Sequence, residues 1–137
     1  MTCKDCPPDS KRPTPFPGPR CATHHRIRAA TVKAAAHARR LSQVYSITAE
    51  FYEALLALQG GTCAVCQRAT GAKRRLAVDH DHNQARLDGH DPEKGCMSCV
   101  RGLLCKSCNR TLGFYRDDPE AFLRAANYLR NWPSRSV

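Results

Sequence analysis

Two pairs of cysteines at close spacing constrain the fold of this chain more than any other feature. Cys63 and Cys66 form the first pair, and Cys105 and Cys108 form the second. Four thiolates can complete the tetrahedral coordination of a zinc ion, which leaves that ion no open position for catalysis. The spacing therefore predicts a structural zinc site that joins two distant segments, and any chemistry must lie elsewhere.

A dense run of acidic and basic side chains lies between the two pairs. It reads Val78-Asp79-His80-Asp81-His82, and Asn109 directly follows the last cysteine. The apolar run 76–78 predicts a short strand that delivers Asp79 and His80 to a cleft. The segment 105–112 predicts a cysteine knuckle that continues into a helix, with Asn109 on the first turn.

Two longer stretches carry a resemblance to a known family. Residues 76–82 read LAVDHDH, and residues 100–113 read VRGLLCKSCNRTLG. With the two cysteine knuckles in this order, they resemble the recombination endonuclease VII family, which belongs to the HNH or ββα-metal nucleases. The resemblance covers roughly residues 46–131. It implies an α+β fold with a small, zinc-stapled ββα-metal (HNH, His-Me finger) core flanked by helices.

The resemblance also implies the chemistry, which is hydrolysis of DNA phosphodiester bonds by an endonuclease. Asp79 and Asn109 would hold a catalytic Mg²⁺ or Mn²⁺, and His80 would be the general base. The residue types suit these roles, because oxygen ligands bind hard divalent ions and a histidine can accept a proton at neutral pH. If the strand continues, His82 shares a face with His80, where it either contacts the scissile phosphate or is structural, and Asp81 points away. A zinc site made of Asp79, His80 and His82 is the alternative.

The substrate implied by the resemblance is branched DNA, such as a Holliday junction in phage recombination, cut by a homodimer. One alternative is an HNH endonuclease that nicks linear duplex with the same residues. The other is a non-catalytic zinc-finger protein that binds DNA, in which the DHDH run is only structural.

Composition favours a nucleic acid as the partner. The 137 residues carry a net charge of +10, and a merely basic protein is the alternative reading. Aromatic residues make up 7%, so we expect metal sites to support a small core. Nine cysteines without an apolar leader or membrane-length segment predict thiolate metal sites in the cytoplasm, which is that of the host if a phage encodes the chain, and no membrane partner.

The chain divides into four predicted parts: 1–25, an N-terminal zinc knuckle or basic arm; 26–60, a helical segment for DNA binding or dimerisation; 61–116, the catalytic module; and 117–137, a C-terminal helix. The first part can form a Cys3His zinc site from Cys3, Cys6, Cys21 and either His24 or His25. A flexible basic arm with free thiols is the alternative.

Residues 26–45 lack Gly and Pro and are rich in alanine, which predicts a helix. Its expected apolar stripe is Ile27, Ala34, Ala38, Leu41 and Tyr45, and the segment 31–41 is the candidate dimer interface. Candidate phosphate contacts are Arg26, Lys33 and Arg40 on this helix, Arg101, Lys106 and Arg110 around the second knuckle, and also 73–75 and Arg116.

Three further predictions concern the remaining segments. Thr48 should cap a helix that ends at Gly60-Gly61, with Tyr52, Leu55, Leu56 and Leu58 in the core. Residues 121–131 should form a helix that packs through Phe122, Leu123, Ala126 and Leu129 and stops at Pro133. In the insertion 83–99, Cys96 and Cys99 could hold a further zinc with His90 or Asp88, or could be free thiols on a hairpin.

Overall fold

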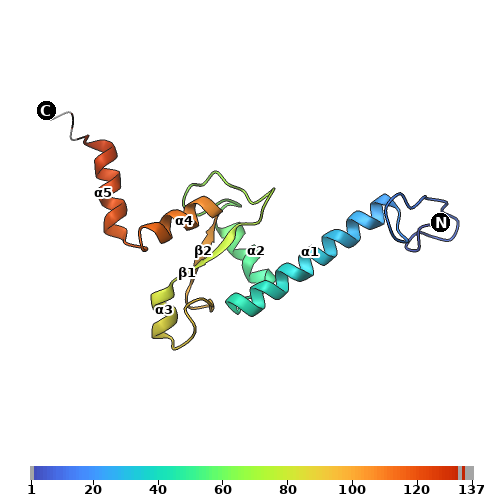
Figure 1. The fold of residues 1–137 in the computed structure, drawn as a ribbon, viewed down its shortest axis with the longest axis horizontal. Helices are drawn as coiled ribbons and strands as arrows, with labels where there is room; N and C mark the ends of the chain where they lie inside the picture. The colour runs from blue at the N-terminus through green and yellow to red at the C-terminus, as the bar shows by residue number, and fades with distance from the viewer. Residues whose placement is uncertain (1, 133, 135–137) are drawn as a thin grey trace. The chain divides into compact units, whose positions relative to one another are not determined.

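The computed structural model describes residues 2–132 and 134, and the chain forms two compact units, Met1–Ala49 and Glu50–Val137. Figure 1 traces the elements in chain order. No helix in the described part of the chain is long and apolar enough to cross a membrane.

The first unit consists of an N-terminal loop and the long helix α1, Ala22–Tyr45. The helix begins four residues before the predicted start, because the extended Cys21 is its N-cap residue. It ends where Ser46 adopts a left-handed conformation and Ile47 N–H donates to the Leu41 carbonyl at 3.3 Å. Leu41 and Ile47 are buried, but Ile27 is 55% exposed. The predicted apolar stripe is therefore buried only towards the end of α1.

The second unit contains α2 (Ala49–Leu58), β1 (Ala77–His80), α3 (His82–Leu87), β2 (Val100–Leu104), α4 (Lys106–Phe114) and α5 (Pro119–Arg130). Helix α2 begins after Thr48 and ends before two glycines with positive φ, as predicted. Tyr52 is buried and its hydroxyl donates to the Leu76 carbonyl at 2.9 Å, which ties α2 to the start of β1. The prediction that Leu58 is a core residue is wrong, because it is 84% exposed.

Strands β1 and β2 form an antiparallel pair, and α4 packs against both (Figure 1). Val78 lies opposite Leu103, Asp79 opposite Gly102, and His80 opposite Val100. Arg101 therefore has no partner in the register and forms a β-bulge next to Asp79. The two strands and the packed helix confirm the predicted α+β fold class.

The outer edge of β2 is covered by a side chain. The amide of Gln59 accepts a hydrogen bond from Leu103 N–H at 2.8 Å and donates one to the Leu103 carbonyl at 2.9 Å. A Cβ atom on Gly102 would lie 3.1 Å from the same amide oxygen. Glycine at this position lets the end of α2 lie close against the strand.

Helix α5 begins at Pro119, and the Asp118 carboxylate caps it by accepting a hydrogen bond from Glu120 N–H at 3.0 Å. The ring of Phe122 contacts Tyr115 edge-on at a centroid distance of 5.1 Å. The predicted packing of Leu123 and Leu129 is wrong, because both side chains are exposed. Pro133, the predicted stop, lies outside the described residues.

Candidate active site

Asp79 is the only buried charged residue among those described, with 8% of its surface exposed. Arg101 donates from Nε to Oδ2 at 2.8 Å and from Nη2 to Oδ1 at 3.0 Å, so it binds the carboxylate with both arms. The bulge places the arginine on the side of β2 where it can reach Asp79. The hydrogen bonds to Asp79 in turn raise the pKa of Arg101, so the guanidinium keeps its positive charge.

His80, the last residue of β1, is held by a backbone carbonyl from the loop after α3. Its Nε2 lies 3.0 Å from the carbonyl oxygen of Pro92. A carbonyl can only accept a hydrogen bond, so this nitrogen must carry the proton. In the neutral ring, Nδ1 is then the acceptor nitrogen, which is the atom that can take a proton from water.

The strand does not continue beyond His80, which corrects the expected alternation of Asp81 and His82. Asp81 is the N-cap residue of α3, and its carboxylate accepts hydrogen bonds from Asn83 N–H at 2.8 Å and Gln84 N–H at 3.1 Å. The Gln84 bond, assisted by the Asn83 bond, lowers the pKa of Asp81. His82 begins α3, and its ring still lies beside His80, with ring centroids 4.6 Å apart.

These residues line one open cavity of about 450 Å³. The cavity joins the end of β1 to α3 and α4, and Asn109 reaches it from the first turn of α4. The structure thus brings together all four predicted catalytic residues. The lining comprises Asp79, His80, Asp81, His82, Asn83, Arg86, Arg101, Asn109, Gly113, Arg116 and Asp117.

A second cavity, of about 640 Å³, shares Asn109 with the first. Its wall includes the loop 68–77 before and into β1 and the start of α4. Five basic side chains line it: Arg68, Lys73, Arg74, Arg75 and Lys106. A cationic surface therefore adjoins the cavity that holds the two histidines.

The two predicted cysteine knuckles come together as one cluster. The ligand atoms of Cys63, Cys66, Cys105 and Cys108 all lie within 4.8 Å of one another, and the Sγ atoms of Cys66 and Cys105 are 4.0 Å apart. Zinc–sulfur bonds of about 2.3 Å in a tetrahedron place two sulfurs about 3.8 Å apart. Hydrogen bonds from the backbone of Arg68 and Ala69 lower the pKa of Cys66 to about 6, which favours the thiolate that a metal needs. This cluster could hold zinc.

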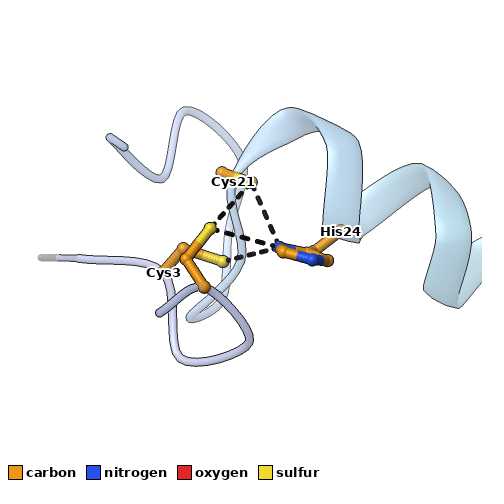
Figure 2. A group of neighbouring side chains, drawn as sticks. Cys3, Cys21 and His24 are labelled. Carbon is orange, nitrogen blue, oxygen red and sulfur yellow. Dashed lines mark hydrogen bonds between the residues drawn. The ribbon is translucent and has the colours of Figure 1, made fainter. Parts of the chain in front are cut away.

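The N-terminal cluster also gathers four potential zinc ligands, and the histidine among them is His24 and not His25. His24 Nδ1 lies 3.3, 3.4 and 3.5 Å from the sulfurs of Cys3, Cys6 and Cys21, close to the sulfur–nitrogen distance of about 3.5 Å in a tetrahedral zinc site. Figure 2 shows Cys3 on the loop and Cys21 and His24 at the start of α1, with the sulfurs gathered on the imidazole. His25 instead stacks on Phe16 at 4.6 Å.

Comparisons with known proteins identify the family of this chain. The profile of the recombination endonuclease VII family matches residues 38–131. The chain belongs to that family. It is 43% identical to the gene 59 protein of Mycobacterium phage D29, over 98% of this chain and 76% of the phage protein. It is 42% identical to the gene 59 protein of Mycobacterium phage L5, over 98% and 77% of the two chains. No solved structure matches it.

Membership in the family identifies the chain as a DNA endonuclease, and it confirms the resemblance drawn from residues 76–82 and 100–113.

The residues predicted to contact phosphate differ in their exposure and in their ion pairs. Arg26, Lys33 and Arg40 are exposed on α1, and Lys106 and Arg110 are exposed on α4. Arg101 differs from these, because its guanidinium pairs with two carboxylates, Asp79 and Asp117, that line the candidate active-site cavity.

Sequence reasoning missed two groups at this site. Asp117 accepts a hydrogen bond from Arg101 Nη2 at 3.0 Å, although residues 117–137 were predicted only to form a C-terminal helix. Arg116 and Asp117 both have φ of 54°, and this left-handed turn after α4 brings the carboxylate back to the cavity. The Pro92 carbonyl was missed because a backbone group inside an insertion leaves no signal in the sequence.

Proposed function

We propose that this endonuclease is an HNH enzyme that hydrolyses DNA phosphodiester bonds with one divalent ion, and that branched DNA is its substrate. The observation that carries the proposal is that Asp79, His80 and Asn109 line the same open cavity, although they come from a strand and a helix far apart in the sequence. A protein that only binds DNA needs no such combination.

The oxygen donors in the cavity fit Mg²⁺ or Mn²⁺. Asp79 would supply a carboxylate oxygen, and Asn109 would supply its amide oxygen. Each carboxylate oxygen has two lone pairs, so the hydrogen bonds from Arg101 leave Asp79 able to coordinate an ion. When bound, the ion would supply Lewis-acid polarisation of the phosphate and stabilisation of the leaving oxygen.

The side chains around these donors have separate roles. His80 accepts the proton of the attacking water at Nδ1, and the Pro92 carbonyl fixes the tautomer and orientation of its ring. Arg101 holds Asp79 in place and brings positive charge to the cavity where the phosphate gains negative charge. His82 would contact the scissile phosphate, a role supported by the position of its ring beside that of His80.

Two clusters are proposed to bind structural zinc: one made of Cys63, Cys66, Cys105 and Cys108, and one made of Cys3, Cys6, Cys21 and His24. The first joins the loop before β1 to the start of α4, because Cys105 is the N-cap residue of that helix. It therefore fixes the helix turn that carries Asn109. The second joins the N-terminal loop to the start of α1, in a unit where few described side chains are buried.

Branched DNA and a homodimer are the finer parts of the proposal. The basic cavity beside Asn109 can take a phosphate backbone leading to the active-site cavity. Cutting both strands of a junction needs two active sites, and α1 exposes Ile27 and Val32 on a helix rich in alanine. Light scattering on the purified protein tests this interface. We expect the wild type to be a dimer and the double variant Ile27→Glu/Val32→Glu to be a monomer.

The decisive experiment measures cleavage of a labelled four-way junction and of a linear duplex with the same arm sequences. Wild type is assayed with Mg²⁺ or EDTA and compared with His80→Ala and Asn109→Ala. We expect cleavage of the junction that EDTA abolishes and that falls by about 10²–10⁴-fold in His80→Ala, because the general base is lost. Junction binding by His80→Ala should remain near the wild-type value.

A matched control is His25→Ala, because His25 stacks on Phe16 and is not among the residues that line the cavity. Equal cleavage of both substrates would instead favour a general HNH nuclease without a preference for junctions. Binding without cleavage by wild type, unchanged by Mg²⁺, would instead identify a non-catalytic DNA-binding protein. Cleavage that persists in His80→Ala would remove this histidine from the base role.

A further inference from the structure

The insertion between His82 and β2 contains a third group of metal-ligating side chains. His90, Cys96 and Cys99 lie with their ligand atoms within 4.8 Å of one another. His90 Nε2 is 3.1 Å from Cys96 Sγ and 4.0 Å from Cys99 Sγ, and the two sulfurs are 3.2 Å apart. The two nitrogen–sulfur distances lie on either side of the about 3.5 Å of a tetrahedral zinc site. The sulfur–sulfur distance is shorter than the about 3.8 Å of such a site, so the two thiolates would move apart when an ion binds.

The backbone folds around the two sulfurs as a compact knuckle. Cys96 N–H points to Cys99 Sγ at 2.8 Å, while Cys99 N–H and Val100 N–H donate to the Cys96 carbonyl at 3.1 and 3.0 Å. Cys99 is buried, and so is Gly95, the residue before Cys96. The loop thus brings the two sulfurs and the imidazole of His90 to one place, as a metal site requires.

A further side chain stands at the edge of the group. Asp88 Oδ2 lies 3.8 Å from Cys96 Sγ, and its carboxylate is oriented by hydrogen bonds from Ser98 Oγ at 2.6 Å and Gln84 Nε2 at 2.7 Å. This carboxylate is not in the group of ligand atoms within 4.8 Å of one another, so it lies beside the site as a neighbour of Cys96.

The same loop reaches the active-site cavity. Pro92, between His90 and Cys96, provides the carbonyl that receives His80 Nε2 at 3.0 Å. The carbonyl of Cys99 accepts Asp81 N–H at 2.8 Å, next to His80. Any ion that joins His90 to the cysteine pair therefore closes the loop that carries Pro92, directly beside the general base.

We propose that His90, Cys96 and Cys99 bind a third zinc ion, and that this ion positions His80 by closing the loop that carries Pro92. The binding site stands on its own geometry, whereas the positioning role rests on the proposed function of His80. In this proposal the insertion holds the end of β1 in place, and the zinc ion holds the insertion together. Its three ligands are positioning residues, because they act through Pro92.

Zinc counting by native mass spectrometry on the full chain tests the site without DNA. Wild type should carry three zinc ions, one for each group, and Cys96→Ser should carry two. His90→Gln is the second variant, since it leaves the buried Cys99 in place and should also carry two. Met97→Ala is the matched control, because Met97 is exposed between the two cysteines and should leave all three ions bound.

Two zinc ions in folded wild type, or a disulfide between Cys96 and Cys99 in the purified protein, would overturn the site. The positioning role is tested separately by junction cleavage. Cys96→Ser and His90→Gln should lower kcat by roughly tenfold with KM unchanged, as misplacement of a catalytic group does. Unchanged kcat with only two zinc ions bound would overturn the positioning role and leave the metal site standing. An inactive wild type that binds three ions would overturn the proposed nuclease function and the positioning role that rests on it, and would leave the metal site standing.

Discussion

Arg101 binds both carboxylate oxygens of Asp79, at 2.8 and 3.0 Å, and the same guanidinium reaches Asp117 at 3.0 Å. The arginine can do this because it is the bulge residue of β2, opposite the end of β1. Asp79 is buried, so its charge needs a partner that stays with it. The ion pair therefore has two effects: it stabilises the pairing of β1 and β2, and it holds Asp79 in the candidate active site.

The first prediction concerns this pair. Arg101→Gln should lower the free energy of unfolding by about 1–2 kcal/mol, because it leaves a buried carboxylate without its cation; this is below the usual cost for a fully buried pair, since Arg101 is partly exposed. Junction cleavage should fall by roughly ten- to a hundredfold, because Asp79 is no longer held. Urea unfolding and single-turnover cleavage measure the two effects.

Arg124→Gln is the matched control for that prediction. Arg124 pairs with Asp118 at 3.3 Å on the surface of α5, where both side chains are exposed, so its loss should change neither quantity measurably. Arg101→Lys should be intermediate, because lysine keeps the charge and loses the two-armed geometry. Full activity in Arg101→Gln would show that Asp79 needs no such support.

The second prediction concerns the basic cavity. Lys73 and Arg74 are exposed and line it beside Asn109, so the double variant Lys73→Gln/Arg74→Gln should weaken DNA binding. Each lost phosphate contact should reduce the slope of log K against log salt by about 0.9, or about 1.8 for both. Fluorescence anisotropy at several salt concentrations gives this slope. The control is Lys11→Gln/Arg12→Gln, in the N-terminal loop, and an equal change in both double variants would contradict the assignment of this cavity to DNA.

The third prediction concerns Tyr52. Tyr52→Phe should lower the free energy of unfolding by about 1 kcal/mol at neutral pH, because the hydrogen bond to the Leu76 carbonyl is lost. Burial raises the pKa of Tyr52 above its ordinary value of 10.0. The contribution of the hydroxyl is therefore intact below that value and is lost as the pH rises through the raised pKa of the folded state. Urea unfolding from pH 8 to 11 should show the difference from wild type shrinking, and a constant difference would contradict this account.

The fourth prediction separates His24 from His25. His24→Ala should remove one zinc ion per chain and expose the loop 7–19 to proteolysis, because three sulfurs then lack their fourth partner. His25→Ala should keep the ion, because this ring stacks on Phe16. Zinc analysis and limited proteolysis measure both. The opposite pattern in the two variants would assign the ligand role to His25.

The local pattern around each knuckle was readable from sequence, because zinc ligation and helix capping depend on spacing within a few residues. The four ligands at Cys63 and those at Cys3 were predicted, and the structure gathers both groups. The strand before Asp79 and the helix carrying Asn109 were also predicted. The predictions that Leu58, Leu123 and Leu129 are buried were wrong. The spacing of apolar residues shows that a helix has an apolar face, but it does not show whether another element covers that face.

The position of His82 shows where local reasoning stopped. Alternation along a strand placed it beside His80, but Asp81 caps a new helix instead, because its carboxylate bonds two backbone N–H groups. The two rings still lie side by side, for a different reason. Whether a residue such as Asp81 continues a strand or caps a helix depends on the path of the segment that follows it. Here the end of that segment bonds back to Asp81, because the Cys99 carbonyl accepts Asp81 N–H.

The sequence by itself determined the family and the α+β class, because both depend on residue type and short spacing. The same local patterns predicted the groups of cysteines and named Asp79, His80 and Asn109 as candidate catalytic residues. Tertiary structure decided which groups surround them. The bulge that brings Arg101 to Asp79, the turn that returns Asp117, and the Pro92 carbonyl at His80 arise from register and loop path. These depend on contacts between distant segments, which no local pattern encodes.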